Sequence, residues 1–406
     1  MGENTLTQQQ SFLDPEFLKC PYPFLKQIRE TASVMFFEPL NVYLVSGYEA
    51  ARTVLLDTAR FSNELTIPGR STGEAERIVA EGGYGRNRRS LQNADEPLHT
   101  VHRELVNEAF RPKRIRQMAD YVDGIVAELI DALGGEGDVV HDFAVPLPLI
   151  VIADQLGVPR DMYRTFKSWS DAWLAGLGTN ISEAEMVKAA HLVVDMQKFL
   201  AARIDERRER PEEDVLSDLA HAQIDGKPVP TATILGIVEQ LLVAGNETTT
   251  NGIAAGLHLL ATQPELHDRL RQQPKLVTEF TEEILRAEAP VQCLFRRVVA
   301  DTQLNGVALP KDSVLLIHYG AASRDETKFP DGDDFDLDRP KKGAHLAFGS
   351  GIHHCVGSEL ARVEMRASFT EFTQRFTRLE MLDDDVSYHP TFALRGIQSL
   401  RLRCVR

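Results

Sequence analysis

The sequence predicts a mainly helical (α+β) fold with small β-sheets. Long segments at residues 117–134, 162–208 and 233–261 repeat apolar side chains three and four positions apart, which is the period of a buried helix face. Shorter runs of β-branched and aromatic residues are typical of strands; they lie at residues 33–37, 42–45, 291–299, 303–309, 314–318 and 398–405, the last expected at a sheet edge. The 406 residues are 43% hydrophobic and 26% charged, as in ordinary globular proteins.

Composition narrows the class of protein. No linker, repeat or low-complexity run divides the chain, so we expect one domain at residues 21–406 after a flexible segment at 1–20. The net charge of −15 argues against nucleic acid as a partner. No apolar run approaches the roughly 18–20 residues of a membrane span, and residues 1–10 lack the core of a signal peptide, so a cytoplasmic protein is expected. The sparse cysteines predict no disulfide framework; they are Cys20, Cys293, Cys355 and Cys404.

The N-terminal part combines short helices with the first strands. Residues 24–30 and 48–56 have helical spacing, and Asn41 lies in the turn between the first two strands. Residues 67–93 are rich in Gly and charge, which predicts a long loop or a broken short helix. Three arginines in this segment could attract an anionic substrate, although a solvated loop is the simpler interpretation; they are Arg86, Arg88 and Arg89.

A helix is predicted from Asp95, which can cap it, through residue 110, with Pro97 in the first turn. His99 and Arg103 are four positions apart and therefore share one face, where two cationic donors suit a carboxylate ligand. Taken alone, such a pair is more often a solvated surface. A basic cluster follows and opposes the overall charge, which favours docking of an acidic partner over a solvated helix start; it consists of Arg111, Lys113, Arg114 and Arg116.

The segment at 233–261 predicts a long buried helix with an unfavourable centre, Ala244-Gly-Asn-Glu-Thr-Thr-Thr-Asn-Gly252. Gly costs about 1 kcal/mol against Ala in a helix, and β-branched Thr adds to the cost. An acid beside hydroxyls, Glu247 and Thr248, is costly in an apolar helix unless it has a function. A polar kink in a core helix is the alternative interpretation.

The segment from Phe348 to Gly357 carries the strongest chemical signal: Phe-Gly-Ser-Gly-Ile-His-His-Cys-Val-Gly. Glycines permit turns with positive φ and close approach to a flat ligand. A helix is predicted directly after it, so Cys355 lies at a helix N-terminus, which favours a thiolate. Cys355 could be a small buried hydrophobe, a zinc ligand together with His345, His353 and His354, or the single axial ligand of a haem.

The pattern F-G-x-G-x-H-x-C-x-G resembles the haem-binding loop of the cytochrome P-450 monooxygenases. Three further patterns follow the order of that family: D-x-P-x-H-x-x-x-R from Asp95, A/G-G-x-E/D-T from Ala244, and E-x-x-R at Glu283 and Arg286. The resemblance extends from about residue 21 to 403. It implies the cytochrome P-450 fold, a single triangular-prism-like domain with a long central helix over haem.

The resemblance also implies roles for individual residues. Cys355 would bind the iron of haem b (iron protoporphyrin IX). The propionates would be held by His99, Arg103, Arg296 and His353. The haem loop would be shaped by Phe348, Gly349, Gly351 and Gly357. Gly245 would leave room over the iron, Thr248 would hydrogen-bond the oxygen being activated, and Glu247 would relay protons. Glu283 and Arg286 would form a buried structural pair with Arg339 as third member, since Asp334 stands where many members carry Arg.

The implied activity is insertion of one atom of O2 into a hydrophobic small molecule. Residues expected near substrate are Leu91, Leu241, Ala244, Val291, Leu294, Phe295, Phe392 and Leu394. Trp169, Trp173 and Leu174 are expected either to roof a pocket or to pack in the core. No flavin or ferredoxin domain is present, so a separate ferredoxin with an NAD(P)H-dependent reductase would supply electrons to a monomeric enzyme, docking near Arg111, Lys113, Arg114 and Arg116. A peroxygenase and a haem sensor or carrier are the alternatives.

Overall fold

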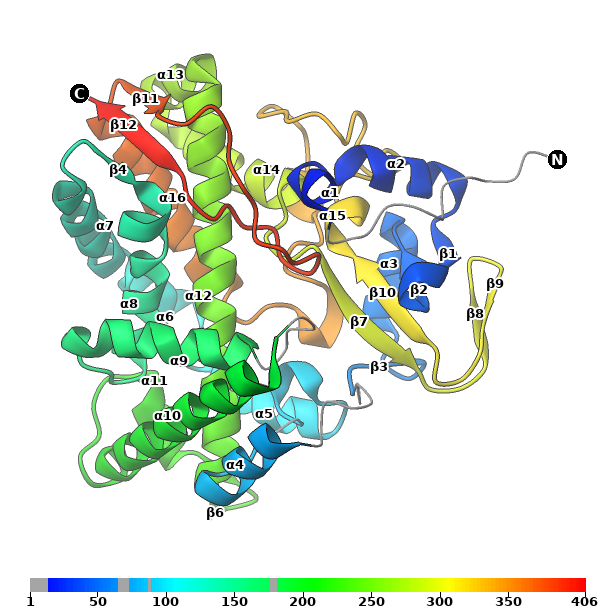
Figure 1. Ribbon diagram of the computed structural model, residues 1–406, viewed down its shortest axis with the longest axis vertical. Helices are drawn as coiled ribbons and strands as arrows, with labels where there is room; N and C mark the ends of the chain where they lie inside the picture. The colour runs from blue at the N-terminus through cyan, green and yellow to red at the C-terminus, as the bar shows by residue number, and fades with distance from the viewer. Residues whose placement is uncertain (1–13, 65–72, 87–88, 176–180) are drawn as a thin grey trace. The chain divides into compact units, whose positions relative to one another are not determined.

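The computed structural model describes residues 14–64, 73–86, 89–175 and 181–406 (Figure 1). The chain divides into two compact units. The first consists of Met1–Asn63, Gln117–Leu147 and Glu247–Arg406, and the second of Glu64–Arg116 and Pro148–Asn246. Helices predominate and the sheets are small, so the predicted fold class is confirmed. Within the segment predicted to be flexible, the described part contains helix α1 (Pro15–Lys19).

A five-stranded sheet forms one part of the first unit. Its order is β1 (Val34–Phe37), β2 (Val42–Val45), β10 (Val314–His318), β7 (Cys293–Val298) and β3 (Phe61–Ser62). Strand β10 pairs parallel with β2, and the other neighbours are antiparallel. Asn41 turns the chain between β1 and β2 at φ 52°, in the left-handed region that Asn tolerates.

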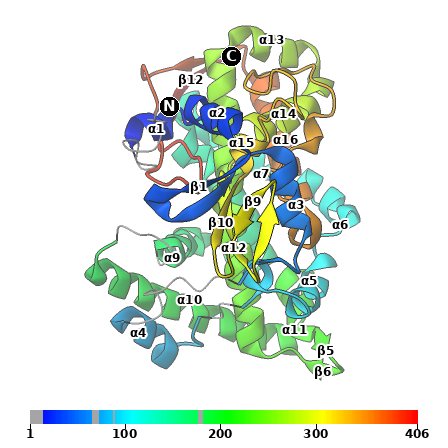
Figure 2. The same cartoon turned by 90° about the vertical axis from the view of Figure 1, so that its right-hand side faces the viewer.

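The two faces of this sheet bury different apolar clusters. Helix α3 (Tyr48–Leu56) covers one face, where Leu315 and Ile317 pack with Val54 (Figures 1 and 2). Leu316 points to the other face and packs with Phe17 of α1. Strand side chains alternate between faces, so consecutive residues of β10 and β7 belong to different clusters.

A second, three-stranded sheet has the order β11 (Arg378–Met381), β12 (Arg401–Val405) and β4 (Glu136–Asp138). The expectation of an edge strand at 398–405 is wrong, because β12 lies in the middle. Its second partner, β4, is only the tripeptide Glu-Gly-Asp and carries no hydrophobic alternation that a sequence pattern could detect. The run at 303–309 is likewise two strands, β8 (Thr302–Leu304) and β9 (Val307–Leu309), joined by an Asn-Gly turn with both residues at positive φ.

The first unit contains the C-terminal half of α12 (Thr231–Thr262) and several further helices. They include α2 (Tyr22–Thr31), α7 (Ala119–Leu133), α13 (Pro264–Gln272), α14 (Val277–Ala287), α15 (Tyr319–Ala322) and α16 (Ser358–Arg375). A Cβ at Gly256 would lie 2.3 Å from the Phe369 ring, and one at Gly252 would lie 3.0 Å from the Met365 side chain. Both glycines therefore allow α16 to pack closely against α12.

The second unit is helical. It contains α4 (Glu74–Gly82), α5 (Leu98–Asn107), α9 (Tyr163–Ala175), α10 (Glu183–Glu209) and α11 (Val215–His221), while α6 (Pro112–Gln117) and α8 (Pro146–Gln155) extend across its limits. Helix α4 occupies part of the segment expected to be a loop or a broken short helix. Strands β5 (Gln223–Ile224) and β6 (Lys227–Pro228) form a hairpin through Asp225 and Gly226, both at positive φ.

Candidate active site

The glycine-rich segment before α16 folds into a tight loop. Gly349 and Gly351 have φ of 68° and 74°, a conformation that other residues rarely adopt. A side chain at Gly351 would also lie 2.7 Å from the Leu55 carbonyl oxygen. The Cys355 amide donates to the Phe348 carbonyl at 2.9 Å and closes the loop. Gly357 has an ordinary φ of −84° and caps α16, and no described atom would lie within 4 Å of a Cβ there.

Charged groups behind the loop fix the Phe348 ring. The Arg362 guanidinium lies 4.6 Å from the ring centroid. Arg362 in turn donates to both oxygens of Glu282, at 2.6 and 3.1 Å. Burial alone would raise the pKa of Glu282, but hydrogen bonds from His345 and Arg362 lower it to about 2. The loop therefore rests on an ionised carboxylate that holds Arg362 in place.

The surroundings of Cys355 differ from those of the two core cysteines. Cys293 and Cys404 are buried, and burial raises the pKa of Cys293 strongly and that of Cys404 to about 11. Cys355 is exposed on its loop, so it is not a small core hydrophobe. Among the described residues, no three His, Cys, Asp or Glu side chains are grouped to bind a metal ion. The described residues therefore do not gather Cys355 with His345, His353 and His354 as a zinc site would require.

Arg296 on β7 is a buried cation, with only 5% of the residue exposed. It donates to the Phe295 carbonyl at 2.7 Å, and Tyr319 is within hydrogen-bonding reach. No carboxylate of the described residues pairs with it. A buried guanidinium without a counter-ion is costly. An anionic ligand group such as a haem propionate would supply that counter-ion, so the donor set of this unit fits a haem.

The centre of α12 remains helical despite its unfavourable sequence. Thr250 donates across to the Ala144 carbonyl at 2.9 Å rather than to its own helix, so its hydroxyl does not bend α12. Leu241, Ala244, Gly245 and Thr248 have the spacing of one helix face. Within this otherwise buried helix, Ala244 is exposed, and Gly245, Glu247 and Thr248 are half-buried. This face of α12 can therefore meet a ligand.

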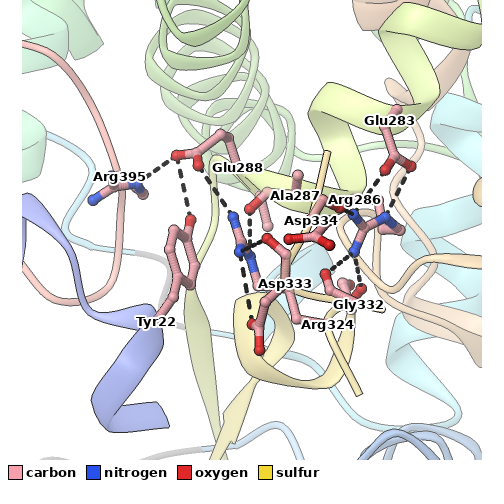
Figure 3. Close-up of polar contacts among 12 residues, drawn as sticks. Tyr22, Glu283, Arg286, Ala287, Glu288, Arg324, Gly332, Asp333, Asp334 and Arg395 are labelled. Atoms are coloured by element: carbon pink, nitrogen blue, oxygen red, sulfur yellow. Dashed lines mark hydrogen bonds and ion pairs between the residues drawn. The ribbon is translucent and has the colours of Figure 1, made fainter. Parts of the chain in front are cut away.

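The E-x-x-R pair is fully buried and anchors the loop from residue 329 to 339 (Figure 3). Arg286 donates to both oxygens of Glu283, at 2.8 and 2.7 Å, and to three carbonyls, those of Ser323, Gly332 and Asp334. Arg339 donates from Nε to Glu283 Oε1 at 3.1 Å. Asp334 contributes its backbone carbonyl, which accepts from both Arg286 and Arg339.

Comparison with known proteins identifies the family. The model of the family "Cytochrome P450" matches residues 165–395. The chain belongs to the cytochrome P450 family. The putative cytochrome P450 YjiB of Bacillus subtilis is 33% identical over 94% of this chain and 93% of its own length. The 6-deoxyerythronolide B hydroxylase of Saccharopolyspora erythraea is 35% identical over 94% and 95%. The structure of CYP109E1 from Bacillus megaterium in complex with corticosterone has 30% identity and a TM-score of 0.83, covering 96% of this chain and 99% of that one.

The chain is therefore a cytochrome P450 monooxygenase, a class of haem enzymes. None of the helices in the described residues combines the length and hydrophobicity that crossing a membrane requires.

Two of the P450 propionate residues proposed from the sequence lie on α5 of the second unit. His99 is buried, which lowers its pKa, and Arg103 donates to Asn107 at 2.9 Å. The prediction that Asp95 caps this helix is wrong, because the cap residue is Pro97 and no side chain caps the helix. The Asp95 backbone carbonyl instead accepts from the His99 amide at 2.9 Å. In this unit, Gln240 of α12 donates to the Ser90 carbonyl at 2.7 Å and holds the turn that carries Leu91.

The remaining pocket residues expected of a P450 lie in the first unit. Val291 forms a β-bridge with Leu394, so the start of β7 and the C-terminal loop are adjacent. Leu294 and Phe295 were both expected to face substrate, but they point to opposite faces of β7. Leu294 shares its face with Arg296, whereas Phe295 and Phe392 pack against the cluster that contains Phe17. Only Leu294 of the two can therefore line a ligand site on the Arg296 side.

The basic residues are partly neutralised within the second unit. Arg111 pairs with Glu108, and Arg114 pairs with Asp218 at 2.5 Å. Lys113 and Arg116 are exposed. In the preceding segment, Arg86 lies 3.8 Å from Glu76 and Arg89 donates to Glu64 at 2.5 and 2.9 Å; Arg88 lies outside the described residues.

Two buried polar clusters were not found from the sequence. In the second unit, Glu239 of α12 accepts from Gln197 at 2.7 Å and from Trp173 at 3.2 Å, so Trp173 is anchored by a polar contact, while Trp169 is buried. In the first unit, Glu288 binds Arg324 and Arg395. The partners are far apart in the chain, so no local spacing could have revealed them.

Proposed function

We propose that this P450 hydroxylates a hydrophobic small molecule with haem b, receiving electrons from a separate ferredoxin and its NAD(P)H-dependent reductase. The overall reaction converts RH, O2, two electrons and two protons into ROH and water. We also propose that residues 21–406 act as one catalytic domain in a cytoplasmic monomer. The four cysteines of the described residues form no disulfide, which agrees with a reducing compartment.

The observation that carries this proposal is that one unit contains both an exposed Cys355 on a rigid glycine loop and a buried Arg296 that pairs with no carboxylate of the described residues. When bound, the haem supplies reductive O2 activation, and a thiolate ligand favours O–O cleavage. Cys355 would be that ligand. Arg296 and His353, together with His99 and Arg103, would hold the propionates, and Phe348, Gly349, Gly351 and Gly357 would shape the loop around the ligand.

The polar centre of α12 would manage protons. Thr248 would offer its hydroxyl inside the pocket, and Glu247, which is only half-buried, would exchange protons with solvent and restore them to Thr248. Gly245 has room for a Cβ, since the nearest described atom would be the Ile152 side chain at 3.8 Å. Its missing side chain therefore serves the ligand rather than helix packing.

Ligation is tested by the spectrum of the reduced, carbon-monoxide-bound protein. The wild type is expected to absorb at the position diagnostic of a thiolate ligand, and Cys355→Ser is expected to lose that band. Cys20→Ser is the matched control because Cys20 is also exposed and forms no disulfide. A Cys355→Ser protein that keeps the thiolate band would refute the assignment.

The propionate role of Arg296 is tested by haem retention during gel filtration. Arg296→Gln is expected to lose haem more readily than Arg297→Gln. Arg297 is the matched control because it is adjacent on β7 and already pairs with Asp312 at 3.0 Å. Equal haem retention in the two variants would contradict the role of Arg296.

Partner docking is tested on the two exposed basic residues. Lys113→Glu and Arg116→Glu are expected to slow reduction by a ferredoxin, most clearly at low salt, because charge steering is screened by ions. Lys275→Glu, a charge reversal at another exposed position, is expected to have little effect.

Two other outcomes would indicate a different function. Turnover with hydrogen peroxide alone would indicate a peroxygenase, and a haem protein that consumes no reductant with any ligand would indicate a sensor or carrier.

The proposed substrate is a hydrophobic small molecule. The pocket residues proposed are apolar. Those of the first unit are Val291, Leu294, Phe392 and Leu394, and those of the second unit are Leu91, Leu241 and Ala244. The related CYP109E1 was solved with corticosterone, so steroids belong in the first screen for a low-spin to high-spin shift. If only hydrophilic ligands produced the low-spin to high-spin shift, a hydrophobic substrate would be contradicted.

A further inference from the structure

Arg395 directly follows Leu394 in the C-terminal loop that borders β7. The loop backbone is bonded to the start of β7: the Gln292 amide donates to the Ala393 carbonyl at 2.8 Å, and the Arg395 amide donates to the Pro290 carbonyl at 2.9 Å. These bonds fix one side of the loop. The Arg395 side chain fixes the other side of the loop.

The Arg395 guanidinium, with a side chain only 8% exposed, joins three segments. Its Nε donates to Glu288 at the end of α14 at 2.7 Å (Figure 3). Its Nη atoms donate to the carbonyls of Leu18 and Lys19, at 2.7 and 3.0 Å. These carbonyls lie at the C-terminal end of α1, where a helix leaves its acceptors unsatisfied. Arg395 therefore caps α1 and ties it to the loop.

The carboxylate that receives Arg395 is shared with a second arginine. Arg324 donates to the other oxygen of Glu288 at 3.2 Å, and the Tyr22 hydroxyl lies 3.3 Å from the oxygen bound by Arg395. Burial alone would raise the pKa of Glu288, but Arg395 and Arg324 lower it, so the carboxylate is ionised. Among the described residues, the other hydrogen bonds of Arg324 go to the carbonyls of Ala287 and Asp333 and not to α1 or the loop. Its guanidinium also lies 3.4 Å from the centroid of the Tyr22 ring on α2.

The same two segments also meet through apolar side chains. Phe17 of α1 is buried in the cluster against which Phe392 packs. Phe17, Leu18, Phe392 and Leu394 line one small cavity between α1 and the loop. A change in the position of α1 is therefore transmitted to the side chains that the proposed function places near substrate.

We propose that Arg395 is a positioning residue for substrate selectivity: by fastening α1 and Glu288 to the loop, it sets the places of Phe392 and Leu394. The inference rests on the proposed function, in which these side chains border the substrate site. Loss of the guanidinium frees one side of the loop while its backbone bonds to β7 persist. The pocket wall then becomes less defined, which affects large rigid ligands more than small ones.

The test compares Arg395→Gln and Arg395→Lys with Arg324→Gln in full-length holoprotein. Both arginines bind Glu288, so the control reproduces the loss of a charge partner without releasing the loop. The probes are imidazole and 4-phenylimidazole, whose direct binding to haem iron is followed spectroscopically. Arg395→Gln is expected to weaken 4-phenylimidazole by about fivefold or more, the effect of one lost hydrogen bond, while imidazole changes less than about twofold. Arg324→Gln should change neither.

Hydrogen exchange gives a readout that does not depend on the bound haem. Arg395→Lys keeps a charge for Glu288 but lacks the fork that reaches both α1 carbonyls. Its peptides covering residues 15–20 and 388–395 should exchange faster, whereas those of Arg324→Gln should not. The proposal would be overturned if substitutions at Arg395 and at Arg324 had equal effects on 4-phenylimidazole binding or on hydrogen exchange. Absence of a thiolate spectrum in the wild type would instead contradict the proposed function.

Discussion

Glu364 on α16 is expected to destabilise the protein at alkaline pH, and replacing it should reverse that effect. Its side chain lies in the core at 2% exposure, and Oε2 has no hydrogen-bond partner among the described residues. Burial raises the pKa of Glu364 to about 8, because an apolar environment disfavours the charged form. The neighbouring Met365 and Phe369 pack against glycines of α12, which leaves the helix little freedom to move the carboxyl toward solvent.

The size of the effect follows from proton linkage. Below pH 4.5 the carboxyl is protonated in both the folded and unfolded states, so Glu364 costs nothing through ionisation. Between pH 4.5 and about 8 the unfolded chain loses this proton while the folded protein keeps it, so the free energy of unfolding falls with rising pH. The slope is about 1.4 kcal/mol per pH unit, which amounts to about 5 kcal/mol over the interval for a rigid site.

The assay is urea unfolding, followed by circular dichroism at pH 5 and pH 8.5, of wild type and Glu364→Gln with equal haem content. The variant should gain stability relative to wild type by several kcal/mol more at pH 8.5 than at pH 5. Glu371→Gln is the control on the same helix, because Glu371 is a partly exposed carboxylate paired with Arg375 at 2.5 Å. An identical pH dependence in wild type and Glu364→Gln would refute the reasoning.

Three further outcomes are expected. Thr248→Ala should uncouple NAD(P)H oxidation from product formation, measured as hydrogen peroxide released per product; unchanged coupling would count against its role in proton delivery. Glu283→Ala should cost about 3–5 kcal/mol in chemical unfolding, because it leaves two buried guanidinium groups uncompensated; a loss below 1 kcal/mol would contradict a structural role. Gly256→Ala should destabilise by about 1–3 kcal/mol through overpacking against Phe369, whereas Gly245→Ala should be tolerated in thermal unfolding.

The sequence by itself determined the helices, strands and turns that depend only on the local pattern of residues. Strand β2 and helix α3 begin and end where periodicity predicts, and α12 matches its predicted span to within two residues at each end. The glycine pattern around Cys355 also needs no tertiary information, because positive φ at Gly349 and Gly351 is a property of the loop itself. Motif spacing was sufficient to indicate the family.

Only the tertiary structure decided which distant groups meet. The pairing of β12 with β4 and the opposite orientations of Leu294 and Phe295 depend on register, which composition does not encode. The contacts of Arg395 join residues up to 377 positions apart, and Glu288 and Arg324 belong to no motif. Their burial is favourable only when all partners are present, because an isolated buried charge is costly. Sequence periodicity reports the burial of single elements, whereas these networks exist only once the elements have packed.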